Sequence, residues 1–277
     1  MSELTQLLSS RWPEVITFLL VLGRTSGLVI SAPFWGGRAV PGLVRVVVAV
    51  SLSVAVYPLA KPVGAIHESP LLLSLLMALG GEVLLGLVLG WAAQLLFAGM
   101  RLAGQEIEIK MGLGLAQLVD PQEGGQTTVL STLFELMAAL VFFSLNGHHL
   151  LIRALASSYS LFPLAGVETR HVAFVQGPVL SLVEGMVVST GEIFTIALRV
   201  SAPVIVGLLL SDIVLVIVSR AIPQMNVFLV ALPLQLAFGM LLLLLSLPAL
   251  VWFCVNQLSA NGLLGPLGPL GSLSLTK

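Results

Sequence analysis

The chain has 277 residues, of which 57% are hydrophobic and only 9% are aspartate, glutamate, lysine or arginine, and its mean hydropathy is +1.08. Soluble domains carry about 25% charged residues, so this composition excludes an ordinary soluble enzyme, and it also excludes a disordered chain, which needs low hydrophobicity and high charge. The formal net charge of -1, with 12 scattered basic residues, excludes a nucleic-acid-binding patch. The high hydropathy and low charge together predict an all-α membrane protein.

A membrane-spanning helix needs about 20 mostly apolar residues. The apolar segments predict helices at 13–32, 43–60, 70–100, 127–145, 177–219 and 227–254. The third and fifth segments are longer than one crossing needs, so each is either one projecting helix or a pair of shorter helices. Pro203 should break or kink the fifth segment near Ala202. We therefore expect six or seven helices.

The two ends of the chain differ in character. The beginning contains the acidic Glu3 and has no basic region before the first apolar run, so we expect a retained helix and no cleaved leader. Residues 256–277 are rich in glycine and proline and predict a flexible tail. Residues 1–255 are then expected to form a single helical subunit.

Several ionisable residues lie inside the apolar segments, where each would cost about 2.5–3.5 kcal/mol at the centre of a lipid-facing helix. They are Arg24, Glu82, Glu135, Glu184, Glu192, Arg199 and Asp212. Two interpretations remain open: an ion or proton path, or buried pairing between helices or with a partner subunit. We favour pairing, because no two acids share a helical spacing with a lone cation. Asp212 and Arg220 are separated by about 12 Å of helical rise and must find other partners.

Close helix packing is predicted at two glycine pairs, Gly23 with Gly27 and Gly86 with Gly90, because small residues four apart let helix backbones approach each other.

The sequence contains no recognisable catalytic or metal-binding motif. His67-Glu68 lacks the second histidine of a zinc-protease motif. His148 and His149 are adjacent, so on a helix they point about 100° apart; beside Asn146-Gly147 they predict a polar turn. We expect no catalytic residue, no cofactor and no metal.

The first unusual stretch is an apolar loop at 111–121. Gly112 and Gly114 oppose a continuous helix, and Asp120-Pro121 ends the stretch. Three placements remain open: the loop fills a cavity, lines a constriction, or tucks under neighbouring helices. Its apolar side chains are Met111, Leu113, Leu115 and Leu118.

The second unusual stretch, 201–233, is an apolar run punctuated by prolines. Kinked backbone at membrane depth survives only where protein or a water-filled cavity satisfies it, so this stretch predicts an interior position in an assembly. The candidate assembly residues are Pro203, Asp212, Arg220, Pro223, Gln224, Asn226 and Pro233, together with Asp120 and Pro121 of the first stretch.

The order and spacing of short motifs over about residues 10–255 resemble the R component of the bacterial flagellar export gate, the membrane part of type III secretion, whose injectisome counterpart is the T component. The matching pieces are Ala32-Pro33, Val40-Pro41, Gly104-Gln105, Met111-Gly112-Leu113, Val119-Asp120-Pro121, Phe142 with Asn146-Gly147-His148, Ser158-Tyr159 with Phe162-Pro163, and Ser219-Arg220 with Pro223-Gln224, Asn226, Phe228 and Pro233. Val119-Asp120-Pro121 and the Pro223 stretch favour the flagellar branch.

The resemblance implies a non-enzymatic core subunit built from kinked helical hairpins. It implies a hetero-oligomer with P-type, Q-type and B-type subunits, at the flagellar basal body in the bacterial inner membrane. It further implies contact with inner-membrane lipid and with unfolded proteins for export. The family assigns the loop before Val119-Asp120-Pro121 to a plug that closes the export pore. The family carries two phenylalanines there, where this sequence has Leu115 and Leu118.

The alternative function is a small-solute permease with its site at a broken helix near Pro203. Permeases often contain repeated halves with paired broken helices, and this sequence shows no such repeat. An intramembrane enzyme lacks any supporting motif.

Overall fold

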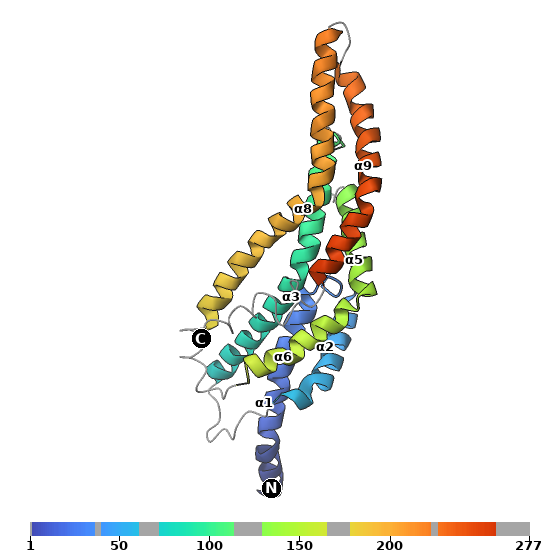
Figure 1. The fold of residues 1–277 in the computed structure, drawn as a ribbon. Coiled ribbons are helices and arrows are strands. Elements are labelled where there is room, and N and C mark those ends of the chain that lie inside the picture. Colours follow the sequence, from blue (N-terminus) through green and yellow to red (C-terminus); the bar gives the residue numbers. More distant parts are fainter. Residues whose placement is uncertain are drawn as a thin grey trace. The chain divides into compact units, whose positions relative to one another are not determined.

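The computed structural model describes residues 2–36, 40–60, 72–113, 129–164, 178–222 and 227–258. Over these ranges the regular elements are all helical, with seven α-helices, one 3-10 turn and no strand (Figure 1). The elements are α1 (Ser2–Ser31), α2 (Gly42–Val56), the 3-10 turn η1 (Tyr57–Leu59), α3 (Leu72–Lys110), α5 (Val129–Ser144), α6 (Gly147–Leu161), α8 (Pro178–Ala221) and α9 (Val227–Leu258). The predicted all-α fold class is confirmed.

The two longest segments are single helices. α3 has 39 residues and α8 has 44 residues, which decides between the two alternatives left open by the sequence. α8 continues through Pro203, so of the break or kink expected near Ala202 the break is wrong. Proline removes one hydrogen bond, the one to the carbonyl of Arg199, and the apolar turns on either side continue the helix. In the same way α9 contains Pro233 and Pro248.

The sequence prediction missed α6, whose mixed polar and apolar residues hide it from a search for apolar runs. The predicted polar turn is right only at Asn146, which has a left-handed backbone with φ 56°; Gly147, His148 and His149 already belong to α6, so the turn predicted for the two histidines is wrong. α9 ends at Leu258, within the predicted tail, and the rest of that tail lies outside the described residues.

Five helical stretches are long and apolar enough to cross a membrane. They are Trp12–Ser31, Gly42–Leu59, Leu75–Lys110, Thr190–Ala221 and Val230–Asn256. α5 and α6 together qualify as one more span that is broken between them. Length and composition therefore give a membrane protein with five or six candidate spans.

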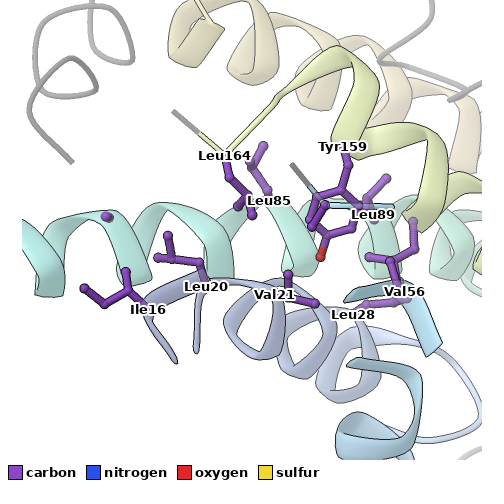
Figure 2. Close-up of a cluster of buried hydrophobic side chains, with 12 residues drawn as sticks. Ile16, Leu20, Val21, Leu28, Val56, Leu85, Leu89, Tyr159 and Leu164 are labelled. Atoms are coloured by element: carbon purple, nitrogen blue, oxygen red, sulfur yellow. The ribbon is translucent and has the colours of Figure 1, made fainter. Parts of the chain in front are cut away.

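The chain divides into two compact units. Unit 1 contains α1, α2, η1, α3 up to Gln94, α6 and α8 up to Ser189; unit 2 contains the rest of α3, α5, the rest of α8, and α9. The core of unit 1 gathers apolar side chains from α1, α3 and α6 with Val56 of α2 (Figure 2). Among them, Leu20, Val21 and Leu28 of α1 and Leu155 of α6 are completely buried.

In unit 1, α1 and the first part of α3 run in parallel and touch through their glycines. A Cβ atom on Gly86 would overlap the carbonyl oxygen of Arg24 and lie 2.8 Å from the backbone nitrogen of Leu28. A Cβ atom on Gly27 would lie 2.9 Å from the backbone nitrogen of Leu87. Backbone therefore packs directly on backbone, and the prediction from the two glycine pairs is confirmed for this crossing.

Unit 2 is organised around the second part of α3. Gly99 packs against Ile196 of α8, and Met100 lies beside Cys254 of α9, with 3.7 Å between the two sulfur atoms. Phe97 meets Phe142 of α5 edge to face, with ring centroids 5.7 Å apart. α3 therefore contacts each of the other helices of this unit.

The helix crossing of unit 1 gives a test on two glycines of α3. Gly86→Ala should destabilise the protein by about 1–3 kcal/mol, because the added methyl group overpacks the contact with α1. Gly80 has open space around it, so Gly80→Ala should stabilise the helix by about 0.5–1 kcal/mol. Thermal unfolding of the detergent-solubilised chain measures both changes. Equal shifts in the two variants would contradict the crossing.

Candidate functional site

A buried arginine joins three helices of unit 1. The Arg24 side chain on α1 is fully buried, and its Nε donates to Oε2 of Glu82 on α3 at 2.6 Å. One terminal nitrogen donates to Oγ of Ser158 on α6, and the other donates to the carbonyl of Phe162 just after α6, each at 2.9 Å. Donors on all three guanidinium nitrogens are therefore used inside the protein.

The aromatic ring of Tyr159 completes this cluster. The guanidinium carbon of Arg24 lies 4.1 Å from the centroid of the ring, a geometry for cation–π attraction. The charge of Arg24 is thus balanced by one carboxylate and covered by one aromatic face. The pairing interpretation of the sequence is confirmed for Arg24 and Glu82.

This ion pair gives a second test. Arg24→Leu leaves the buried Glu82 carboxylate without its cation, so we expect a loss of about 3–5 kcal/mol in the free energy of unfolding. Arg24→Leu combined with Glu82→Leu should cost less than the sum of the two single changes, because no unpaired charge remains. Thermal unfolding in detergent measures the four-variant cycle.

The control for this cycle is the pair Arg101 and Glu135, whose side chains are 44% and 40% exposed and lie 3.8 Å apart. Arg101→Leu should change stability by at most about 1 kcal/mol. Strictly additive losses at Arg24 and Glu82 would contradict their coupling.

The other ionisable residues do not join this cluster. Asp212 of α8 accepts a 2.5 Å hydrogen bond from the side-chain amide of Gln235 on α9, and it does not pair with Arg220. Glu192, Arg199 and Arg220 are exposed, and the side chain of Glu184 lies outside the description. Within the described part of the chain, no cluster of three histidine, cysteine or acidic side chains could hold a metal ion.

The end of α3, where the apolar loop begins, has a defined backbone structure in unit 2. α3 ends on Gly112, which has a left-handed backbone with φ 78° and donates to the carbonyl of Ile109 at 3.1 Å. The next amide, of Leu113, donates to the carbonyl of Glu108 at 3.2 Å. This pair of bonds is a Schellman motif, which stops a helix at a glycine. The predicted role of Gly112 in ending the helix is therefore confirmed.

Met111 fixes this helix end to α9. Its side chain is fully buried, and a Cβ atom on Gly239 would lie 2.7 Å from its Cγ and 3.0 Å from its sulfur. Met111 thus packs on the bare backbone of α9, while Leu113 beyond it is partly buried. The first candidate plug residue packs between helices of this chain, and the loop leaves the helix directly after it.

The remaining sequence candidates fall into two groups. Pro203 and Pro233 are exposed positions inside continuous helices. The others lie outside the described residues: Leu115, Leu118, Asp120, Pro121, Pro223, Gln224 and Asn226.

Sequence reasoning missed the role of Glu108. Glu106 and Glu108 are two residues apart, which places them on opposite sides of a helix, and in the structure Glu106 is exposed while Glu108 is buried. Oε2 of Glu108 accepts the backbone N–H of Leu130 at 2.9 Å. The signal was present in the sequence, because Glu108 falls between the buried apolar positions Ile107 and Met111.

Comparison with known proteins gives matches that cover most of this chain. A family model described as bacterial export proteins, family 1, matches residues 15–260. The flagellar biosynthetic protein FliR of Bacillus subtilis is 34% identical over 238 residues, covering 83% of this chain and 85% of the relative. The chain belongs to this family of bacterial export proteins. FliR of Escherichia coli is 28% identical over 257 residues, covering 92% of this chain and 93% of the relative.

The family also includes relatives outside the flagellar proteins. The Yop proteins translocation protein T of Yersinia pestis is 26% identical over 254 residues and covers 88% of each chain. The resemblance to the R and T components is therefore confirmed over most of the chain. Family membership and the apolar helices together make the chain a membrane component of bacterial export machinery.

Proposed function

We propose that this chain is a non-enzymatic core subunit of the flagellar type III export gate in the inner membrane, and that it helps form and close the channel for unfolded flagellar proteins. The observation that carries the proposal is membership of the export family over residues 15–260, with FliR proteins among the relatives. The partners proposed are the P-type, Q-type and B-type subunits of the gate.

The closing element proposed is the loop at 111–121. Its support is an apolar sequence that starts from a firmly held base, because Met111 is buried on α9 and Gly112 ends α3. Hydrophobic constrictions close pores by excluding water, and leucine at 115 and 118 is large and apolar enough to do so. A loop on a fixed base can return to one closed position after a substrate has passed.

The exposed apolar surface of the chain supports the proposal that partner subunits bind to it. α2, α8 and α9 leave many large apolar side chains exposed, among them Leu43 at 77% and Leu245 at 71%. Patches of this kind mark membrane or protein contacts. The permease alternative was based on a broken helix near Pro203, and α8 is unbroken there, so this observation no longer supports it.

The plug is tested by removing its two leucines. Leu115→Gly with Leu118→Gly should leave normal amounts of the export complex and raise the permeability of the cell membrane to ions and small solutes, because the hydrophobic seal is lost. Complex recovery and cation leakage are measured on the same cells. Normal recovery with unchanged leakage would remove the plug role from these positions, and failed assembly would favour a packing role.

Arg220 provides a test of assembly. It is exposed in the last turn of α8, so a partner subunit is proposed to cover and pair with it. Arg220→Ala should lower recovery of the co-expressed complex without lowering the thermal stability of the chain alone. Lys277→Ala is the control and should change neither. Full recovery of the complex with Arg220→Ala would contradict the pairing.

A further inference from the structure

Two charged side chains lie exposed on the first part of α8 within unit 2. Glu192 and Arg199 belong to the candidate span Thr190–Ala221, and both are exposed. They are seven residues apart, which is about 10.5 Å of helical rise. Among the described residues, neither of the two forms an ion pair. This part of α8 therefore presents one negative and one positive charge that the described chain does not balance.

The same side of α8 is otherwise apolar. Because an α-helix has about 3.6 residues per turn, Gly191, Leu198 and Ala202 lie on one line along α8. Glu192 and Arg199 lie on a parallel line beside it. All five residues are exposed, and the side chain of Leu198 is 65% exposed. These five residues are called the Glu192–Arg199 face.

We propose that the Glu192–Arg199 face binds a helix of another membrane subunit, which places a basic side chain against Glu192 and an acidic side chain against Arg199. The inference rests on the proposed function, because it assigns one contact of this chain inside the export gate. The two charges of the partner helix lie two turns apart, since each must meet one charge of a pair with that spacing.

Neither lipid nor water suits this face. Lipid disfavours both charges, because a charged side chain in hydrocarbon loses its hydration. Water disfavours the large apolar side chains around them, among which Phe194 is 61% exposed. A partner helix with matching charges satisfies both requirements, because it covers the apolar side chains and supplies an opposite charge at each position.

The glycine of the face leaves room for a close approach. A Cβ atom on Gly191 would meet no other atom within 4 Å, so no described residue packs on it. The other described glycines inside the helices of unit 2 each pack against another part of the chain: Gly99, Gly104, Gly207 and Gly239. Helix backbones approach each other closely at such residues. Gly191 is therefore open to the backbone of a partner helix.

A second copy of this chain does not fit the face. Copies inserted into the membrane in the same orientation have parallel α8 helices, and a two-fold contact then places each charge against the same charge of the other copy. Like charges in contact disfavour binding. The partner is therefore a different chain. A parallel partner helix carries its base before its acid, and an antiparallel partner helix carries its acid before its base.

The test reverses the two charges in the full chain, which is co-expressed with the P-type, Q-type and B-type subunits. The variants are Glu192→Arg, Arg199→Glu and both changes together, and Gly191→Leu fills the open space with a side chain. Recovery of the complex measures docking, and thermal unfolding of the detergent-solubilised chain alone measures its fold. The control is Glu106→Arg, which reverses an exposed acid on α3 of the same unit.

Each single reversal should lower recovery of the complex by about 10-fold or more, because it sets like charges against each other. The double reversal should lower recovery further, because both contacts become repulsive. Gly191→Leu should also lower recovery, since its side chain holds the partner helix away. The thermal stability of the chain alone should not fall in any of these variants, because the substituted positions are exposed. Glu106→Arg should match the wild type in both measurements.

A photo-crosslinking amino acid at Leu198 identifies the occupant of the face. The crosslink should join this chain to a helix of another subunit that carries an acid and a base seven residues apart. Reversal of those two partner charges should then restore recovery of the double-reversal variant, because both contacts become attractive again.

Wild-type recovery of both single reversals would overturn the inference. Restoration of recovery by the double reversal without any change in the partner would also overturn it, because the two charges would then act on each other. A crosslink to lipid or to a second copy of this chain has the same consequence. If the reversal variants are unstable alone, Gly191→Leu decides: lost recovery of a stable chain supports the inference, and normal recovery overturns it.

Failure of this inference is distinguishable from failure of the proposed function. Recovery of the wild-type chain with the gate subunits, together with unaffected reversal variants, removes only the Glu192–Arg199 face. Absence of a complex with the wild-type chain removes the proposed function as well.

Discussion

A fully buried arginine must have its charge balanced and its donors used, and Arg24 meets both conditions with groups from separate parts of the chain. Glu82 supplies the charge, Ser158 and Phe162 accept hydrogen bonds, and Tyr159 covers the guanidinium face. Removing any one of these partners leaves a buried polar group uncompensated, which costs more than the bond itself contributes. The arrangement of α1, α3 and α6 in unit 1 depends on this requirement.

The glycine crossing and the ion pair reinforce each other. Gly86 lets α3 approach so closely that it meets the backbone carbonyl of Arg24 itself. The close approach brings Glu82, one turn earlier, within reach of the Arg24 side chain. Packing of small residues sets the distance between the helices, and the ion pair sets their register, because only one alignment satisfies both.

Unit 2 uses the same combination of a glycine contact and a buried carboxylate at the base of its apolar loop. Gly104 brings α5 against α3, and Glu108 accepts the buried backbone N–H of Leu130 at the start of α5. Met111 then packs the end of α3 on Gly239. These contacts hold the last turns of α3 against the first turn of α5 and against α9.

The sequence by itself determined the membrane class, the all-α fold, the glycine crossing and the family, because hydropathy, small-residue spacing and motif order are local properties of the chain. The sequence favoured pairing of the buried charges but could not identify which residue pairs with which, since Arg24 and Glu82 are 58 residues apart. The sequence search for apolar runs missed α6 because polar residues interrupt its apolar ones; in the structure Ser158 and Tyr159 contact Arg24 of α1, while Ser157 and Ser160 bond to carbonyls of α6 itself. Only the tertiary structure decided that α8 continues through Pro203 and that Glu108 caps α5, because both depend on which backbone groups the neighbouring turns and helices satisfy.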